Sequence, residues 1–294
     1  MSGFRSAREV SFSPSQLCAL VGEADAGKSN LLAAIRAVLD PAAAPLSPAD
    51  AAEDGDGEVT IRVSLADGGE ASLTGRVGSH AVTGPAALPP LIFLPAVARA
   101  GGVLADPSPH GQGSAEAIEI FRAALADDRR TSTGQALSVI DALESCCARG
   151  LSGLLLLIEE PELYLRPQAQ RYLYRLLREF ALAGNQVIYS THSPAFLNVA
   201  RLDELVFVER LPQTGTRALQ PEPVSADEDF RVMTEFDAAR SELFLARAVV
   251  LVEGLTEKLV LPFVFSALGY DADREGISII ECGGKPNIPL FARI

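Results

Sequence analysis

The residues from 22 to 30 combine two glycines, a lysine and a serine at a spacing that suits phosphate binding. Gly22–Ser29 reads G-x-x-x-x-G-K-S, the full pattern of a phosphate-binding loop. The glycines let backbone N–H groups curl around phosphate oxygens, because no Cβ stands in the way. Lys28 can reach the β- and γ-phosphates of a nucleotide, and the Ser29 hydroxyl can ligate Mg²⁺. The predicted nucleotide-binding residues are Gly22, Glu23, Ala24, Asp25, Ala26, Gly27, Lys28, Ser29 and Asn30.

Two consecutive carboxylates follow the most apolar predicted strand. Residues 154–158 are all Leu or Ile, and Glu159 and Glu160 come directly after them. The carboxyl end of a parallel strand faces the ligand crevice of an α/β sheet. We therefore predict that Glu159 ligates Mg²⁺, although Asp is the usual residue there, and that Glu160 polarises the water that attacks the γ-phosphate. The alternative is a solvated strand end with two charges of no function.

Two further segments carry polar groups that can contact an anion. His192 follows the predicted strand 186–189, and a histidine at that strand end can contact a γ-phosphate; a purely structural histidine is the alternative. Ser132, Gly134 and Gln135 precede a predicted helix, where a hydroxyl and backbone N–H groups can meet an anion. A helix N-cap explains the latter segment equally well.

The elements that must position these residues alternate between strands and helices. The strand 17–21 and the helix 29–39 flank the glycine-rich loop, and two runs that alternate in polarity, 58–63 and 71–77, predict an inserted antiparallel hairpin. Further strands are predicted at 91–94, 154–158, 186–189, 205–209, 248–252 and 277–280, and helices near 118–125, 136–148, 162–183 (capped by Gly184) and 257–268. Residues 211–229 are polar and contain proline, which makes them the best candidate for a linker. This alternation predicts an α/β fold with a largely parallel sheet.

Composition sets the broad class of the protein. With 294 residues, 48% of them apolar and 21% charged, the chain can bury the core of one large or two smaller domains. The net charge of −13 argues against a broadly basic nucleic-acid-binding surface, but not against a local basic groove. No apolar run reaches about 18 residues and no apolar signal region is present, so we expect no membrane span and a cytoplasmic protein. The four cysteines show no metal-ligand or disulfide pattern and suit reduced thiols.

The order of these segments resembles that of a known group of proteins. The glycine-rich loop, Ser132–Gln135, Glu159–Glu162 and Thr191–Ser193 follow one another as they do in ABC-type ATPases of the SMC/RecF-like group. Phe4–Arg5–Ser6 and residues 95–99 are also similar to that group. Residues 246–258 then resemble the start of a Toprim domain. An ABC-type ATPase followed by Toprim is the arrangement of OLD (overcoming lysogenization defect) family nucleases, and this resemblance covers essentially the whole chain.

The resemblance implies several roles. ATP and Mg²⁺ are the expected cofactors of an ATPase domain over residues 1–240, in which Ser132 closes on ATP bound to a second subunit of a homodimer. Gln112 would be the metal-sensing glutamine. The remaining residues, 241–294, would form a partial Toprim domain in which Glu253 and Glu257 ligate divalent metals for DNA cleavage. We expect DNA as a partner and no membrane.

The Toprim resemblance also shows which groups are missing. The family continues with a strand that ends in Asp-x-Asp, whereas Asp271 and Asp273 precede the predicted strand 277–280 and should lie away from Glu253. We therefore expect an OLD-type ATPase whose nuclease is incomplete in this chain. The alternatives are an ATP-dependent dimerisation switch with little turnover, and a nuclease completed by another chain. A P-loop kinase or GTPase explains neither Ser132–Gln135 nor His192.

Overall fold

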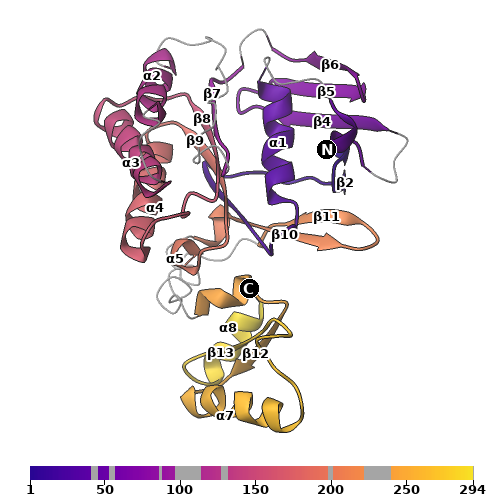
Figure 1. Ribbon diagram of the computed structural model, residues 1–294, viewed down its shortest axis with the longest axis vertical. Helices are drawn as coiled ribbons and strands as arrows, with labels where there is room; N and C mark the ends of the chain where they lie inside the picture. Colours follow the sequence, from indigo (N-terminus) through magenta and orange to yellow (C-terminus); the bar gives the residue numbers. More distant parts are fainter. Residues whose placement is uncertain are drawn as a thin grey trace. The chain divides into compact units, whose positions relative to one another are not determined.

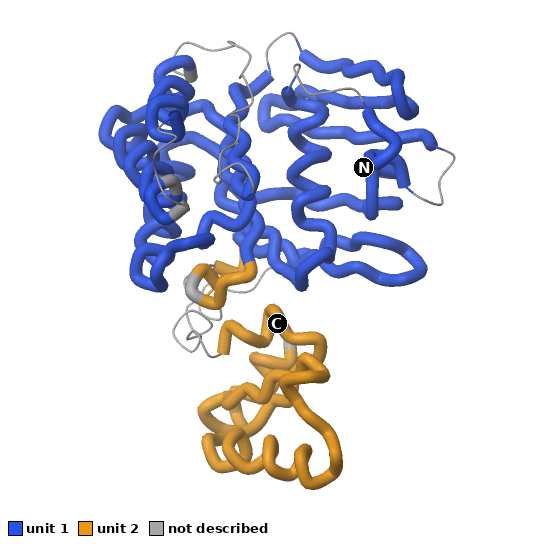
Figure 2. Tube along the Cα trace, in the orientation of Figure 1, with its two compact units in different colours: residues 1–191, 204–220 blue, residues 192–203, 221–294 orange. Residues whose placement is uncertain are grey.

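The computed structural model describes residues 1–40, 46–52, 57–85, 88–96, 114–126, 132–197, 201–221 and 240–293. The chain divides into two compact units (Figure 2). Unit 1 comprises Met1–Thr191 and Glu204–Gln220, and unit 2 comprises His192–Asp203 and Pro221–Ile294. The domain boundary between residues 240 and 241 stays a prediction.

Unit 1 is built on one mixed sheet. Among the described residues it has eleven strands in the order β6-β5-β4-β1-β2-β11-β10-β3-β9-β8-β7. The five strands from β10 to β7 run parallel to one another. They are β3 (Leu17–Val21), β7 (Leu91–Leu94), β8 (Leu155–Glu159), β9 (Gln186–Thr191) and β10 (Leu205–Leu211). Their carboxyl ends therefore lie along a single edge, which is where α/β sheets hold ligands.

The other six strands form the antiparallel part of the sheet. They are β1 (Ser2–Phe4), β2 (Ala7–Glu9), β4 (Glu58–Ser64), β5 (Glu70–Arg76), β6 (Ser79–Thr83) and β11 (Gly215–Leu219). The predicted hairpin is confirmed as β4 and β5, with β6 as an additional strand. β11 pairs with both β2 and β10, so it joins the antiparallel part to the parallel part.

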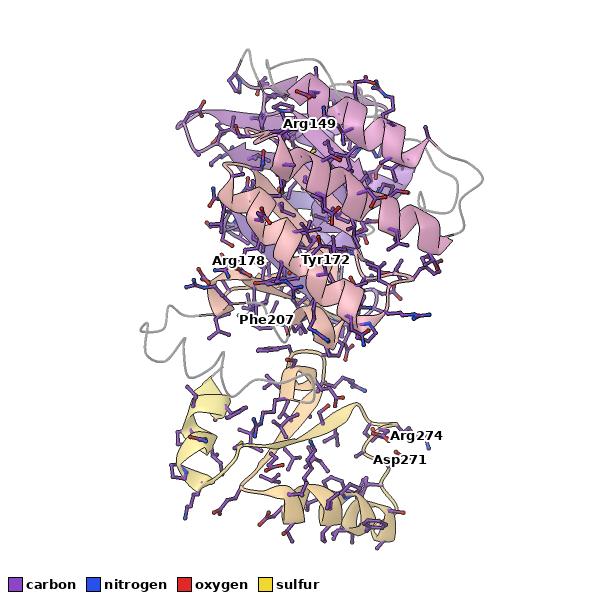
Figure 3. All side chains as sticks on the ribbon, turned by 90° about the vertical axis from the view of Figure 1, so that its left-hand side faces the viewer. Arg149, Tyr172, Arg178, Phe207, Asp271 and Arg274 are labelled. Carbon is purple, nitrogen blue, oxygen red and sulfur yellow. The ribbon has the colours of Figure 1, made fainter. Side chains whose placement is uncertain are left out.

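Helices cover both faces of this sheet (Figure 1). Helix α1 (Lys28–Leu39) packs on β4, β5, β8 and β9, and its buried apolar residues form the main core with alternate residues of the strands. Helix α4 (Pro167–Leu182) packs on β3 and β9 from the other face. Helix α3 (Ser132–Ala148) packs beside α4, and α2 (Ser114–Leu125) packs on α3. Figure 3 shows this helical layer, with Tyr172 and Arg178 on α4 and Arg149 just after α3.

Three sequence-based boundaries were wrong. Helix α4 begins at Pro167 rather than near Glu162, because Glu160 and Tyr164 adopt left-handed backbone angles that interrupt a helix. Residues 215–219, predicted to lie in a linker, form β11 because they find backbone partners on two distant strands. Helix α3 includes Ser132–Gln135, which we predicted to precede it, and the Ser138 hydroxyl donates to the Gly134 carbonyl within its first turns.

Unit 2 contains the predicted β-α-β arrangement. Strands β12 (Ala248–Val252) and β13 (Ile277–Glu281) are parallel and are connected through α7 (Leu255–Ala267). The unit also contains α5 (Pro194–Leu197) and α8 (Ile288–Arg293).

Both units contain short 3₁₀ turns. They occur at Pro48–Asp50, Leu202–Glu204, Arg240–Phe244 and Lys285–Asn287.

Candidate nucleotide-binding site

The glycine-rich loop connects β3 to α1, as predicted from the sequence. β3 is buried along its whole length and sits between β9 and β10, so its end is fixed on both sides. A Cβ on Gly22 would lie 1.9 Å from the Val208 carbonyl oxygen, and Gly27 has φ 109°. Each glycine is thus required for its own reason: Gly22 by the close approach of backbone, and Gly27 by its left-handed conformation.

Lys28 is buried beneath the loop. Its side chain is 5% exposed, and Nζ donates hydrogen bonds to the carbonyl oxygens of Gly22 at 2.8 Å and Glu23 at 2.7 Å. Burial lowers the pKa of Lys28 to about 8, against the opposing effect of Glu160, Glu162 and Asp25, whose negative charges raise it. The loop and the carboxylate segment after β8 lie at one edge of the sheet, because Val21 at the end of β3 pairs with Thr191 of β9 and Glu159 at the end of β8 pairs with the adjacent Ser190.

The carboxylates after β8 are held by neighbouring strands. Glu159 ends β8, and its Oε2 accepts a hydrogen bond from the Ala96 N–H, just after β7, at 3.0 Å. Glu160 has φ 45°, and its N–H donates to the Ser190 carbonyl on β9 at 3.0 Å. A non-glycine residue in this conformation at a strand end is uncommon and occurs often at functional sites. Oxygen donors from Ser29 and Glu159 suit a hard cation such as Mg²⁺.

Glu162 has a positioning role that the sequence did not reveal. It is 8% exposed, and its Oε1 accepts a hydrogen bond at 2.8 Å from the hydroxyl of Thr191, the last residue of β9. This bond joins the turn after β8 to the end of β9. Only the segment's resemblance to ATPases pointed to Glu162, because nothing in its local spacing distinguishes it from a surface carboxylate.

The remaining predicted residues of the ATPase part differ in what the structure shows. The Ser29 side chain is exposed, whereas Asn30 donates its amide to the Ser6 hydroxyl at 2.6 Å. Gly134 lies in the first turn of α3, but the side chains of Ser132 and Gln135, and all of Gln112, lie outside the described residues. His192 directly follows β9 and is the first residue of unit 2. Their roles toward ATP stay predictions.

The two predicted metal ligands of unit 2 lie close together in the chain after β12. Glu253 and Glu257 are both exposed, and the Glu257 carboxylate lies 3.6 Å from the position that a Cβ would take on Gly254. In the strand pairing Ala248 stands opposite Ile277, so Asp271 and Asp273 lie near the start of β12, away from Glu253 (Figure 3 labels Asp271). Across the described part of the chain, no three His, Cys, Asp or Glu residues are grouped to hold a metal ion.

Comparisons with known proteins match each part separately. Residues 244–294 match the family model of the TOPRIM domain of proteins like the overcoming lysogenization defect protein, and residues 137–197 match that of an AAA ATPase domain. The chain is 41% identical over 145 residues to the OLD nuclease of Thermus scotoductus, a match that covers 47% of this chain and 28% of the relative. Its C-terminal part is thus similar to OLD-like TOPRIM domains and its middle part to AAA ATPase domains, and the chain shares sequence with an OLD nuclease.

The OLD-family relatives are much longer than the matched segments. The chain is 30% identical over 150 residues to the Old nuclease of Escherichia phage P2. This match covers 49% of this chain and 25% of that protein. The chain thus spans about a quarter of the length of the curated relatives that it matches. Among solved structures, the chain is similar to the SMC head domain of Thermotoga maritima, at 14% identity and a TM-score of 0.47. The match covers 76% of this chain and 97% of that domain.

Within the described residues, no helix has the length and apolar character needed to span a membrane.

Proposed function

We propose that this chain binds and hydrolyses ATP with Mg²⁺ and acts as a homodimer. The observation that supports the proposal is that the loop carrying Lys28 follows β3 and Glu160 follows β8, and that both strands pair in parallel with β9 and end at the same edge of the sheet. Lys28 would hold the β- and γ-phosphates. Glu160 would accept the proton of the attacking water, and Ser29 and Glu159 would hold Mg²⁺, which neutralises phosphate charge.

Steady-state ATP hydrolysis by the full chain, with and without Mg²⁺, tests this proposal. Lys28→Ala should abolish both binding of an ATP analogue and turnover, whereas Lys258→Ala, which removes a lysine of α7, serves as the matched control. The proposal fails if the wild-type chain does not hydrolyse ATP, or if Lys28→Ala retains its turnover. A doubling of the native mass with ATP in Glu160→Gln would support the dimer.

The replacement of the usual metal-binding Asp by Glu159 favours a second function, an ATP-dependent dimerisation switch with little turnover that recruits DNA or a partner. The longer side chain is already engaged by the Ala96 N–H. Under this alternative Glu160→Gln should dimerise and recruit DNA as the wild type does. Measurable wild-type turnover that is lost in Glu160→Gln, with loss of the DNA or partner recruitment that depends on it, would argue for the enzyme.

DNA cleavage is the third part of the proposal, and it rests on the OLD-family likeness of residues 244–294. Glu253 and Glu257 supply two carboxylates, which is fewer than a two-metal site needs, so cleavage would require groups from another chain or segment. Plasmid nicking with Mg²⁺ or Mn²⁺ by this polypeptide alone, abolished in Glu253→Ala, would show that no such addition is needed.

A further inference from the structure

A continuous set of hydrogen bonds links the glycine-rich loop to the turn between β1 and β2 and to β11. The Arg5 guanidinium contacts the Asn30 Oδ1 at 3.3 Å, and the Asn30 amide contacts the Ser6 Oγ at 2.6 Å. The hydroxyls of Ser6 and Thr216 are 2.7 Å apart, and the Thr216 Oγ1 lies 2.9 Å from the Ala26 carbonyl oxygen. Ser6 lies between β1 and β2, and Thr216 lies on β11. The loop residue Ala26 is therefore held by residues from other parts of the chain.

The chemistry of these groups limits which of them can donate. The Ala26 carbonyl can only accept, so the single hydroxyl proton of Thr216 is donated to it. That proton is shared with the Ser6 Oγ, toward which Thr216 is also the donor, and the Ser6 Oγ accepts from the Asn30 amide as well. A guanidinium only donates, so Arg5 begins the sequence, and its charge is paired with Asp50 at 2.8 Å. We call this set, Arg5–Asn30–Ser6–Thr216–Ala26, the loop relay.

The loop relay is packed as well as hydrogen-bonded. Thr216 is 1% exposed, and a Cβ added to Gly27 would lie 2.2 Å from its Oγ1. The Thr216 N–H donates to the Ser6 carbonyl at 2.7 Å. A buried hydroxyl held between the Ser6 Oγ and the Ala26 carbonyl oxygen leaves the Ala26–Gly27 peptide unit little freedom to rotate.

We propose that Thr216 and Ser6 are positioning residues for nucleotide binding. By holding the Ala26 carbonyl outward, toward β11, Thr216 fixes the adjacent peptide units so that their N–H groups remain available to phosphate oxygens on the other side of the loop. Preorganisation of this kind increases affinity because the loop has less freedom to lose on binding. The inference rests on the proposed ATP-binding function of the loop.

The decisive variant is Thr216→Val, which keeps the shape of the side chain and removes the hydroxyl. We expect its KM for ATP to rise by about five- to tenfold, from the loss of a buried hydrogen bond, with kcat changed by less than about twofold. Thr216→Ser restores the hydroxyl and should bring KM back near the wild-type value. Thr83→Val is the matched control, because it removes a hydroxyl that bonds to Ser72, on β5, at 2.8 Å and lies outside the relay.

Ser6→Ala provides a second route if Thr216→Val does not fold. It removes the contact between the Ser6 and Thr216 hydroxyls but leaves the bond to Ala26, so KM should rise less, about two- to threefold. The two substitutions should be non-additive when combined, because they interrupt one sequence of bonds.

The outcomes separate this inference from the function on which it rests. A wild-type chain that neither binds nor hydrolyses ATP refutes the proposed function. Wild-type turnover with an unchanged KM in both Thr216→Val and Ser6→Ala refutes the loop relay alone. A Thr216→Val protein that loses kcat and thermal stability while its KM stays constant assigns Thr216 a purely structural role, and this too overturns the inference.

Discussion

Raising the pH through 8 should weaken ATP binding, because Lys28 must carry its proton to pair with phosphate. Burial has lowered its pKa to about 8, from an ordinary value of 10.5. At pH 7 about 90% of the Lys28 side chains are charged, and at pH 9 about 10%. If only the charged form binds, the affinity for ATP falls about tenfold between those two pH values, which corresponds to about 1.4 kcal/mol.

The bound phosphates must in turn raise the pKa of Lys28, so binding at pH 8 should take up about half a proton. Isothermal titration calorimetry at pH 7, 8 and 9, in two buffers of different ionisation enthalpy, measures both the affinity and the proton uptake. The Lys258→Ala chain should follow the wild-type curve. Glu160→Gln removes a charge that raises the Lys28 pKa, so its transition should move to lower pH.

The sign of the effect on the nucleotide-free protein is opposite. Because the folded chain binds fewer protons at Lys28 than the unfolded chain between about pH 8 and 10.5, the free energy of unfolding should rise with pH in that window.

The prediction for ATP binding has its own refuting result. It is refuted if the affinity for ATP agrees within about twofold at pH 7 and 9 and if binding at pH 8 takes up no proton.

Three other substitutions test the site and its support. Glu160→Gln should lower single-turnover ATP hydrolysis at least a hundredfold by removing the proton acceptor, with ATP affinity within about threefold of wild type at pH 7, and an unchanged rate would remove Glu160 from the chemistry. Thr191→Val should destabilise unit 1 in urea by about 1–3 kcal/mol, since it leaves the buried Glu162 without this hydroxyl donor; a loss below 0.5 kcal/mol would contradict this. Asn185→Ala removes three buried side-chain bonds, which should cost about 2–4 kcal/mol of unfolding free energy, while the KM for ATP stays the same.

The elements around the glycine-rich loop could be predicted because their signals are local. An apolar strand, a fixed glycine spacing and an amphipathic helix follow one another within 23 residues of sequence, from Leu17 to Leu39. The β-α-β part of unit 2 was equally clear, since each of its elements has its own apolar run. Both predictions depended on neighbours in the chain and required no knowledge of the tertiary structure.

The predictions that failed concern residues whose conformation is set from a distance. Leu165 fits the helical spacing of α4, yet the left-handed Glu160 and Tyr164 prevent the helix from starting there. β11 contains glycine, threonine and arginine, so only its pairing with β2 and β10 makes it a strand. Thr216 meets Ala26 across 190 residues of chain, and no local pattern could have indicated that contact.

The order of strands in the sheet has a consequence for synthesis of the chain. β3 carries the glycine-rich loop within the first 30 residues, but its two sheet neighbours, β9 and β10, are formed by residues 186–191 and 205–211. β11 bonds to the loop through Thr216 and joins the antiparallel part of the sheet to the parallel part. This strand ends at Leu219. A nascent chain on the ribosome therefore displays the loop sequence long before it can hold the loop in shape, and nucleotide can act as a folding ligand only after about three quarters of this chain has emerged.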